Sequence, residues 1–260
     1  MVPVREVVEV LRGTLDLELL IRLVPELGLA RGLTQSPYHH LDTLGHVLET
    51  VRCVRRELED GSLGARVPPG REEALLFAAL VHDVAKPLTR GEVEGRVVFV
   101  AHDTLGARMV ERVCLRLGAP AMLSDLARTL THLHLKIGFM ENPRTDYPPE
   151  RIVRAAGPFC EELAVLSWAD RLAARGPRLR KEHIERHRRL CARFIEVGRT
   201  LGPCREPDYE GLSSKLAHPP GAVVGAAASR LRILRAGGME EEEAFGRVWS
   251  AAGVLHKEDR

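Results

Sequence analysis

Aromatic residues and lysine are scarce in this sequence. Of its 260 residues, 4% are aromatic and 45% are hydrophobic, which excludes an aromatic-rich core and leaves leucine, valine and alanine to pack helices. Only five of the 38 basic residues are lysine, so 33 are arginine. The formal net charge of +2 argues against a protein that coats nucleic acid in bulk, but it leaves room for a local basic patch.

The chain also lacks paired cysteines and long apolar runs. Its five cysteines include no C-x-x-C pair: Cys53, Cys114, Cys160, Cys191 and Cys204. An odd, scattered set is typical of buried thiols in a reducing compartment, not of a disulfide framework. No run of apolar residues is long enough to span a membrane, and Arg5, Glu6 and Glu9 exclude a signal peptide. We therefore expect a cytoplasmic protein without a membrane span.

Helical periodicity runs through most of the sequence and predicts an all-α fold. The one strand-like run, 97–100, follows two glycines and predicts a short hairpin. After Pro203 the composition changes to Gly, Pro, Ala and Ser, so we expect a main domain over residues 1–203 and a small C-terminal helical extension over 204–260. The predicted helices cover about 5–23, a segment ending near 58, 71–86, 103–117, 122–135, 149–156, 159–175, 180–200 and 219–255.

Histidines and aspartates lie on the apolar faces of several predicted helices. His82 and Asp83 share the leucine and alanine face of helix 71–86, and Asp170 lies at helical spacing from leucines in its own helix. His102 and His134 also share stripes with apolar residues. A buried ionised carboxylate without a partner costs several kcal/mol. A shared metal ion is the economical explanation for these five side chains.

Two histidines do not fit this pattern. His46 lies opposite the apolar stripe of its helix, so it is buried only if that helix packs on two sides, and the pattern leaves the question open. His132 shares a face with Asp125 and Arg128 and is predicted to be solvated. The histidines that we expect on the surface are His183, His187, His218 and His256.

The order of these residues resembles the signature of the HD phosphohydrolase superfamily, H…HD…D on a bundle of helices. The flanking segments are similar to the HD domain in the C-terminal half of bacterial tRNA nucleotidyltransferases and poly(A) polymerases, and the tail resembles the helical extension after that domain. The likeness runs from about residue 20 to 249. The segments that carry it are 35–46 (QSPYHHLDTLGH), 81–87 (VHDVAKP), 99–107 (FVAHDTLGA), 134–136 (HLK), 169–176 (ADRLAARG) and 219–225 (PPGAVVG).

The resemblance implies a metal centre with one ion or, in members that have two extra histidines, two ions. The ligands that it implies are His46, His82, Asp83 and Asp170 for the first ion, and His102 and His134 for the second, with Asp83 bridging. Imidazole and carboxylate ligands without a thiolate favour Mn, Fe, Co, Ni or Zn over Ca. Two such cations can jointly polarise a phosphoryl oxygen and support in-line attack on phosphorus.

Basic side chains near these positions could contact a substrate phosphate. Lys86 is a candidate, although it could instead be a cation at the end of a helix. Arg171 and Arg175 could bind phosphate through a bidentate contact, but both could pair with surface glutamates, which is the better account of Arg175. His39 and His40 could line the mouth of the pocket.

The sequence departs from the resembled enzymes at its N-terminal end. Their catalytic head, which carries a glycine-rich loop and a D-x-D pair, precedes the HD domain by well over a hundred residues, whereas about 45 residues precede His46 here. Segment 13–18 (GTLDLE) mimics that motif, but we place it inside an amphipathic helix and interpret it as structural. We therefore expect that this chain does not add nucleotides by itself.

The expected activity is that of a metal-dependent phosphohydrolase, a phosphomonoesterase or phosphodiesterase acting on nucleotides or on RNA ends such as 2′,3′-cyclic phosphates. The alternative is a non-catalytic module that binds tRNA or another RNA, or a partner, and works beside a separate nucleotidyltransferase. The arginine-rich run 178–193 could face RNA, but glutamates interleaved at i,i+4 spacing favour a solvated helix face. The sequence does not predict the oligomeric state.

Overall fold

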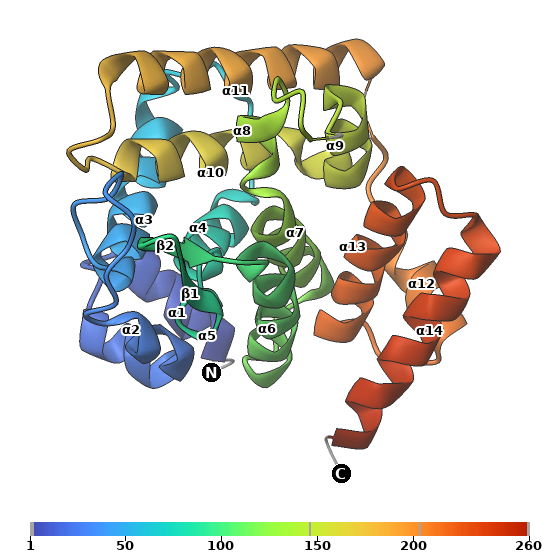
Figure 1. Ribbon diagram of the computed structural model, residues 1–260. Coiled ribbons are helices and arrows are strands. Elements are labelled where there is room, and N and C mark those ends of the chain that lie inside the picture. The colour runs from blue at the N-terminus through green and yellow to red at the C-terminus, as the bar shows by residue number, and fades with distance from the viewer. Residues whose placement is uncertain (1–2, 146, 203, 259–260) are drawn as a thin grey trace.

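Helices make up most of the structure, a computed structural model (Figure 1). It describes residues 3–145, 147–202 and 204–258, with side chains described as far as residue 251. The prediction of an all-α fold is confirmed. Within the described part, the sheet is a single hairpin in which β1 (Arg90–Val93) pairs antiparallel with β2 (Arg96–Phe99), Arg90 opposite Phe99. The hairpin predicted around residues 97–100 is therefore present.

The chain begins with two short helices where we predicted one helix over residues 5–23. They are α1 (Pro3–Arg12) and α2 (Leu17–Leu23). Leu15 has a positive φ of 56°, and the Asp16 carboxylate accepts a hydrogen bond from the backbone N–H of Leu19, so it caps α2. Segment 13–18 is thus a turn and a helix start, and its placement inside a helix was wrong. A 3₁₀ helix, η1 (Pro25–Ala30), follows.

Three long helices form the centre of the molecule. They are α3 (Thr43–Asp60), α4 (Glu72–Val81) and α10 (Cys160–Ala173). α3 packs against α10 on one side and α4 on the other. Every residue of α4 from Ala74 to Val81 is buried, which matches its nearly continuous apolar sequence.

The predicted helix 71–86 ends five residues early. After α4, the backbone N–H groups of Val84 and Lys86 donate to the carbonyls of Val81 and Asp83, three residues back. These tight turns replace the i→i−4 ladder and carry the chain into the short helix α5 (Lys86–Thr89), which has Pro87 in its first turn. The segment with His82 and Asp83 is therefore a turn, not a helix.

The helices after the hairpin lie close to their predicted ranges. They are α6 (His102–Arg116), α7 (Ala121–Leu133), α9 (Pro149–Ala156) and α11 (Lys181–Leu201). Two short elements were not predicted, α8 (Lys136–Phe139) and the 3₁₀ helix η2 (Gly157–Phe159). α6 packs on α7, and α11 lies across α10 at the edge of the molecule (Figure 1).

The C-terminal part consists of α12 (Tyr209–Leu216), α13 (Ala222–Ala236) and α14 (Glu241–Glu258). The predicted helix 219–255 is broken because Gly238 has a φ of 90°, which residues with a side chain rarely adopt. α13 packs closely on α7: a Cβ atom on Gly225 would lie 2.1 Å from the carbonyl oxygen of Ala121. The two helices can approach this closely only because Gly225 has no side chain.

The contact between α13 and α7 buries polar groups. Arg232 donates to both oxygens of Asp125, at 2.6 and 3.2 Å, and Arg128 donates to the Ser229 hydroxyl. Asp125 is fully buried and Arg128 is buried. The face of α7 that we predicted to be solvated is therefore covered by α13. Its charges pair with those of the covering helix, which a pattern of polar residues cannot reveal.

No disulfide links the described cysteines. Cys53, Cys114 and Cys191 are buried thiols, as expected, but Cys160 is half-buried and Cys204 is exposed. Among the described residues, no helix combines the length and the apolar character that crossing a bilayer requires.

Candidate metal centre

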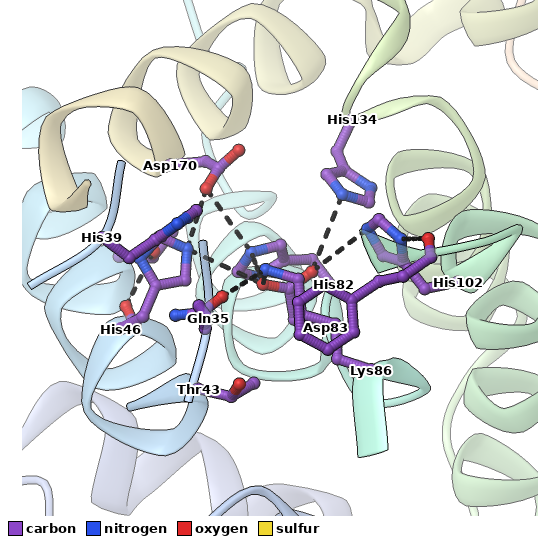
Figure 2. A network of polar contacts seen from close by, with 12 residues as sticks. Gln35, His39, Thr43, His46, His82, Asp83, Lys86, His102, His134 and Asp170 are labelled. Atoms are coloured by element: carbon purple, nitrogen blue, oxygen red, sulfur yellow. Dashed lines mark hydrogen bonds and ion pairs between the residues drawn. The ribbon is translucent and has the colours of Figure 1, made fainter. Parts of the chain in front are cut away.

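Six predicted ligands converge from five separate segments (Figure 2). Each segment delivers a side chain from a helix or from a turn at a helix end, so the packing of the helices sets their positions. The residues and their places are His46 on α3, His82 and Asp83 in the turn after α4, His102 at the start of α6, His134 just after α7, and Asp170 in the last turn of α10.

One oxygen of Asp83 faces the α3 side of the cluster. Its Oδ2 lies 3.2 Å from His82 Nε2 and 3.7 Å from His46 Nε2. Lys86 Nζ is 2.6 Å from the same oxygen. The Asp83 side chain is 1% exposed and both imidazoles are fully buried, so this carboxylate is removed from bulk water.

The other oxygen of Asp83 faces the α6 and α7 side. Its Oδ1 lies 3.5 Å from His102 Nε2 and 3.8 Å from His134 Nε2. The ligand atoms of Asp83, His102 and His134 all lie within 4.8 Å of one another, and so do those of Asp83, His46 and His82. Asp83 is thus common to two groups of three potential ligands, one at each of its oxygens.

Three of the histidine rings share a hydrogen bond to the carbonyl three residues back. The pairs are His82 Nδ1 with Ala79 O at 2.8 Å, His102 Nδ1 with Phe99 O at 2.8 Å, and His134 Nδ1 with Thr131 O at 2.7 Å. A carbonyl oxygen only accepts, so Nδ1 must carry the proton in each ring. The neutral ring then presents the lone pair of Nε2 to the cluster, which is the tautomer that a metal ligand needs.

His46 is buried, which answers the question that its helical phase left open. α3 packs on both α4 and α10, so the face opposite its apolar stripe is covered as well. His46 Nε2 lies 2.8 Å from Asp170 Oδ1, and this contact joins α3 to α10. Asp170 is 23% exposed, so its side of the cluster is open to solvent.

The electrostatics of the cluster favour a positive charge near Asp83. Burial alone raises the pKa of Asp83, but the neighbouring His82 and Lys86 outweigh it and hold the pKa well below its usual range. Burial lowers the pKa of His82, but the Asp83 carboxylate acts in the opposite direction and outweighs it. The pKa of His82 is therefore raised. Burial lowers the pKa of His134 to about 3. Asp83 is therefore ionised and His134 neutral at neutral pH.

The donor set fits divalent transition ions. His82 Nε2 and His102 Nε2 are buried and accept no hydrogen bond from any described residue. Buried polar atoms without a partner are costly, and a cation at each oxygen of Asp83 would satisfy both nitrogens. Mixed imidazole and carboxylate groups suit Mn, Fe, Co, Ni or Zn.

Comparison with known proteins agrees with this geometry. The HD domain family matches residues 43–175, just over half of the chain, and the match includes all six residues of the cluster. The chain belongs to the HD domain family. HD domains bind divalent metal ions and define a superfamily of metal-dependent phosphohydrolases.

Two curated relatives of this HD domain protein are tRNA nucleotidyltransferases. The A-adding tRNA nucleotidyltransferase of Deinococcus radiodurans is 34% identical over 171 residues, which cover 64% of this chain and 36% of that enzyme. The CC-adding tRNA nucleotidyltransferase of Thermus thermophilus is 30% identical over 234 residues, 87% of this chain and 49% of that enzyme. The chain thus spans about a third to a half of the length of these relatives, and the predicted relationship to them is confirmed.

Lys86 lies beside the six potential ligands, here called the HD cluster: His46, His82, Asp83, His102, His134 and Asp170. It is buried, and its ammonium group contacts Asp83 and donates to Gln35 Oε1 at 2.6 Å. Lys86 begins α5, so the alternative of a cation at the C-terminus of a long helix is wrong. Gln35, which the sequence reasoning did not single out, holds the lysine from the segment before α3. A motif search centred on ionisable groups overlooks such an amide.

A cavity of about 400 Å³ lies beside the HD cluster, between the segment before α3 and α11. His39 lines it and packs edge-on against His46, with ring centroids 4.9 Å apart, as expected of a residue at the pocket mouth. Arg171 also lines it, from the turn of α10 that carries Asp170. His40 is exposed and accepts a hydrogen bond from the backbone of Arg175.

His187 was wrongly predicted to lie on the surface. It is buried between α11 and α10, where its Nε2 lies 3.0 Å from the Ser167 carbonyl oxygen. Burial lowers its pKa to about 4. His183 is exposed, as predicted, and His218 is half-buried. The side chain of His256 lies outside the described residues.

His132 was also wrongly predicted to be solvated. It is half-buried, and burial lowers its pKa to about 4. It belongs to neither group of potential ligands around Asp83. The assignment of His134 as the inward residue and His132 as the outward one therefore agrees with the geometry, although His132 is half-buried and not fully solvated.

Proposed function

We propose that this chain is a metal-dependent phosphohydrolase with a dinuclear centre that cleaves phosphoesters of nucleotides or of RNA ends such as 2′,3′-cyclic phosphates. The observation that carries the proposal is the division of the ligands at Asp83. Two imidazoles face each of its oxygens. A bridging carboxylate between two such groups is the arrangement that two-metal phosphohydrolases need.

The residues divide into two ligand sets. His46, His82, Asp83 and Asp170 would hold one ion, and Asp83, His102 and His134 would hold the other. Bound divalent ions supply Lewis acidity toward a phosphoryl oxygen and a nucleophile at neutral pH. The carbonyl groups behind His82, His102 and His134 keep these rings in the neutral tautomer and in fixed orientations.

Lys86 and Arg171 would act on the substrate phosphate. Lys86 is fixed between Asp83 and Gln35, and its charge would stabilise negative charge that develops on the phosphoryl group. Arg171 lines the cavity beside the cluster and can donate two parallel hydrogen bonds to a phosphate. Its Nε is buried and makes no hydrogen bond within the described part of the chain, so the guanidinium keeps a donor for a ligand.

Two observations favour a nucleotide or RNA end as substrate. The relatives named above are tRNA nucleotidyltransferases, and the cavity beside the cluster is lined by Arg171 and Arg186. Arginine is well suited to phosphate recognition because its planar fork matches the phosphate oxygens. A terminal phosphoester that enters this cavity would lie beside His39, which packs against His46 of the cluster, while the rest of the polynucleotide remains outside.

The test is metal analysis coupled to a phosphoester panel. We expect purified protein, prepared without chelators, to carry close to two equivalents of transition metal. With Mn, Co or Ni present it should hydrolyse nucleoside 2′,3′-cyclic phosphates or 2′-phosphates, and it should not extend an RNA primer. Chelator-treated protein is the matched control.

Two outcomes contradict the proposal. Protein that stays metal-free when Mn or Co is added lacks the centre. Metal-bound protein that is inert on the whole panel, yet binds tRNA with a steep salt dependence, is a non-catalytic RNA-binding module. The first outcome removes the metal site and the second removes the hydrolytic activity.

A further inference from the structure

A second cavity, of about 730 Å³, lies where the HD region meets the C-terminal helices. Its walls come from α6, α7, α13 and α14, and Figure 1 shows α13 between α7 and α14. None of the six residues of the metal cluster lines it. Its volume is in the range of small-molecule sites. The residues that line it are Thr104, Leu105, Arg108, Met109, Arg112, Arg128, His132, Arg230, Ile233, Leu234, Arg247, Val248 and Ala251.

Arginine dominates the charge of this cavity. Among the described lining residues are five arginines, one or two from each of the four helices, and no aspartate or glutamate. Glutamates outside the lining offset part of this charge, and Arg247 donates to Glu243 at 2.8 Å. Arg230 donates to Glu111 at 2.6 Å, and Arg128 Nε lies 3.6 Å from the same carboxylate. One buried carboxylate thus serves two of the guanidinium groups.

Two of the arginines retain unused donors. Arg108 is exposed and makes no hydrogen bond or ion pair with any described residue. Arg128 is 8% exposed, and its Nε makes no hydrogen bond in the described structure. Burial lowers the pKa of Arg128 to about 10. Arg108 thus has no carboxylate partner among the described residues, and Arg128 shares Glu111 with Arg230, so both can still bind an anion in the cavity.

The rest of the lining is apolar. Leu105, Met109, Ile233, Leu234 and Val248 provide a hydrophobic wall. Such a wall suits a flat ring, whereas inorganic phosphate alone would leave it without a contact. Because the arginines approach from four helices around one hollow, they fit a compact group of phosphates better than a linear polynucleotide backbone.

We propose that this cavity binds a nucleoside di- or triphosphate, with its phosphates on the arginines of α6, α13 and α14 and its base on the apolar wall. The site is separate from the HD metal centre. α14 contacts the rest of the structure mainly through α13, so a ligand held by both Arg108 and Arg247 would link α14 directly to α6. Ligand binding would then stabilise the packing of the C-terminal helices on the HD region.

The test is calorimetric titration of the chelator-treated 260-residue chain, in which the metal centre cannot take part. The ligands are ATP, ADP, pyrophosphate and inorganic phosphate, each also added to the Asp83→Ala variant. We expect ATP and ADP to bind both proteins equally. Pyrophosphate should bind at least tenfold more weakly than ADP, because it leaves the apolar wall empty.

Charge reversal locates the site. Arg108→Glu should weaken ADP binding at least tenfold, because it places a carboxylate beside the phosphates. Arg189→Glu, an exposed arginine on α11 far from this cavity in the fold, is the matched control and should leave the affinity unchanged. If Arg108→Glu does not fold, Arg108→Gln should still weaken binding severalfold.

Three results would overturn the proposal. The first is that ADP and ATP do not bind, and the second is that they bind Arg108→Glu as tightly as the wild type. A short oligoribonucleotide without terminal phosphates could bind where ADP does not, which would make the cavity part of an RNA-binding surface. Because metal is absent from the titration, these results do not depend on whether the HD centre hydrolyses phosphoesters.

Discussion

Two buried aspartates in this molecule have opposite surroundings. Asp125, between α7 and α13, accepts hydrogen bonds from Arg232, Thr129 and the Tyr209 hydroxyl, so its charge is compensated by the chain itself. Asp83 is just as buried, but each of its oxygens faces a pair of imidazoles at 3.2 to 3.8 Å, and neither oxygen has a complete set of hydrogen-bond donors among the described residues. A buried carboxylate with a complete set of donors is structural, whereas one surrounded by potential metal ligands is arranged to share a cation with them.

The largest effect that this comparison predicts is loss of the metal centre. Asp83→Ala removes the group shared by both ligand sets, so we expect most of the bound metal to be lost. Phosphoester hydrolysis should fall by several orders of magnitude, because the nucleophile depends on the metal. Metal analysis and initial rates check this. Retention of both ions by Asp83→Ala would show that Asp83 does not bridge the sites.

The matching change at the structural aspartate should act on stability. Asp125→Ala leaves Arg232, whose side chain is 14% exposed, without its carboxylate partner, and breaking a buried pair costs about 3–5 kcal/mol. We expect the free energy of unfolding to fall by about this amount in urea denaturation, while the folded variant keeps its metal. A variant that loses metal at unchanged stability would reverse the roles of the two aspartates.

Single histidine substitutions can remove one of the two metal ions and leave the other bound. His102→Ala or His134→Ala should lose about one equivalent of metal and keep the fold, because each removes a ligand from one side of Asp83 only. His132→Gln is the control, and it should keep both ions. If His132→Gln lost an ion and His134→Ala kept both, the assignment of the two residues would have to be exchanged.

A smaller effect is expected at Lys86. Lys86→Ala should lower kcat on the order of 10- to 100-fold while the metal content stays constant, if the lysine stabilises charge on the phosphoryl group. Rates normalised to bound metal test this. A drop in metal content equal to the drop in rate would instead make Lys86 a residue that positions Asp83.

The smallest effect is a pH dependence of stability that arises from His132, on α7 near its contact with α13. His132 has a pKa of about 4 in the folded protein, lowered by burial and by Arg128, against an ordinary value of 6.5. Between these values the unfolded chain binds a proton that the folded protein does not, so stability falls as pH drops from 6.5 toward 4. We expect this loss in the free energy of unfolding to be about 1–2 kcal/mol, less than the full pKa shift corresponds to, because His132 is partly exposed to solvent.

Comparison with His132→Gln isolates this contribution, because other histidines titrate in the same range. The loss of stability between pH 6.5 and 4 should be smaller in the variant than in the wild type. Equal losses would mean that His132 is as well solvated in the folded protein as in the unfolded chain.

The sequence correctly predicted the features that depend on local apolar periodicity and on the order of motifs along the chain. The ranges of α6, α7, α9, α10 and α11 were predicted to within a few residues, as was the hairpin before them. The inward phase of His102 and His134 followed from their spacing to leucines and valines. The helix breaks at Leu15 and Gly238, and the turn that carries His82 and Asp83, were missed because they depend on backbone geometry that apolar periodicity does not encode.

The amino-acid sequence by itself determined the fold class, the family and five inward-facing polar side chains, because helical periodicity and the order of the HD motif are local properties of the chain. Only the tertiary structure decided that His46 is buried, that the face of Asp125 is covered, and that the two oxygens of Asp83 point to different pairs of histidines. These facts depend on which helices pack against each other. A helix shows only its own faces in its sequence, and whether a polar face meets water, an ion or another helix is settled by its neighbours.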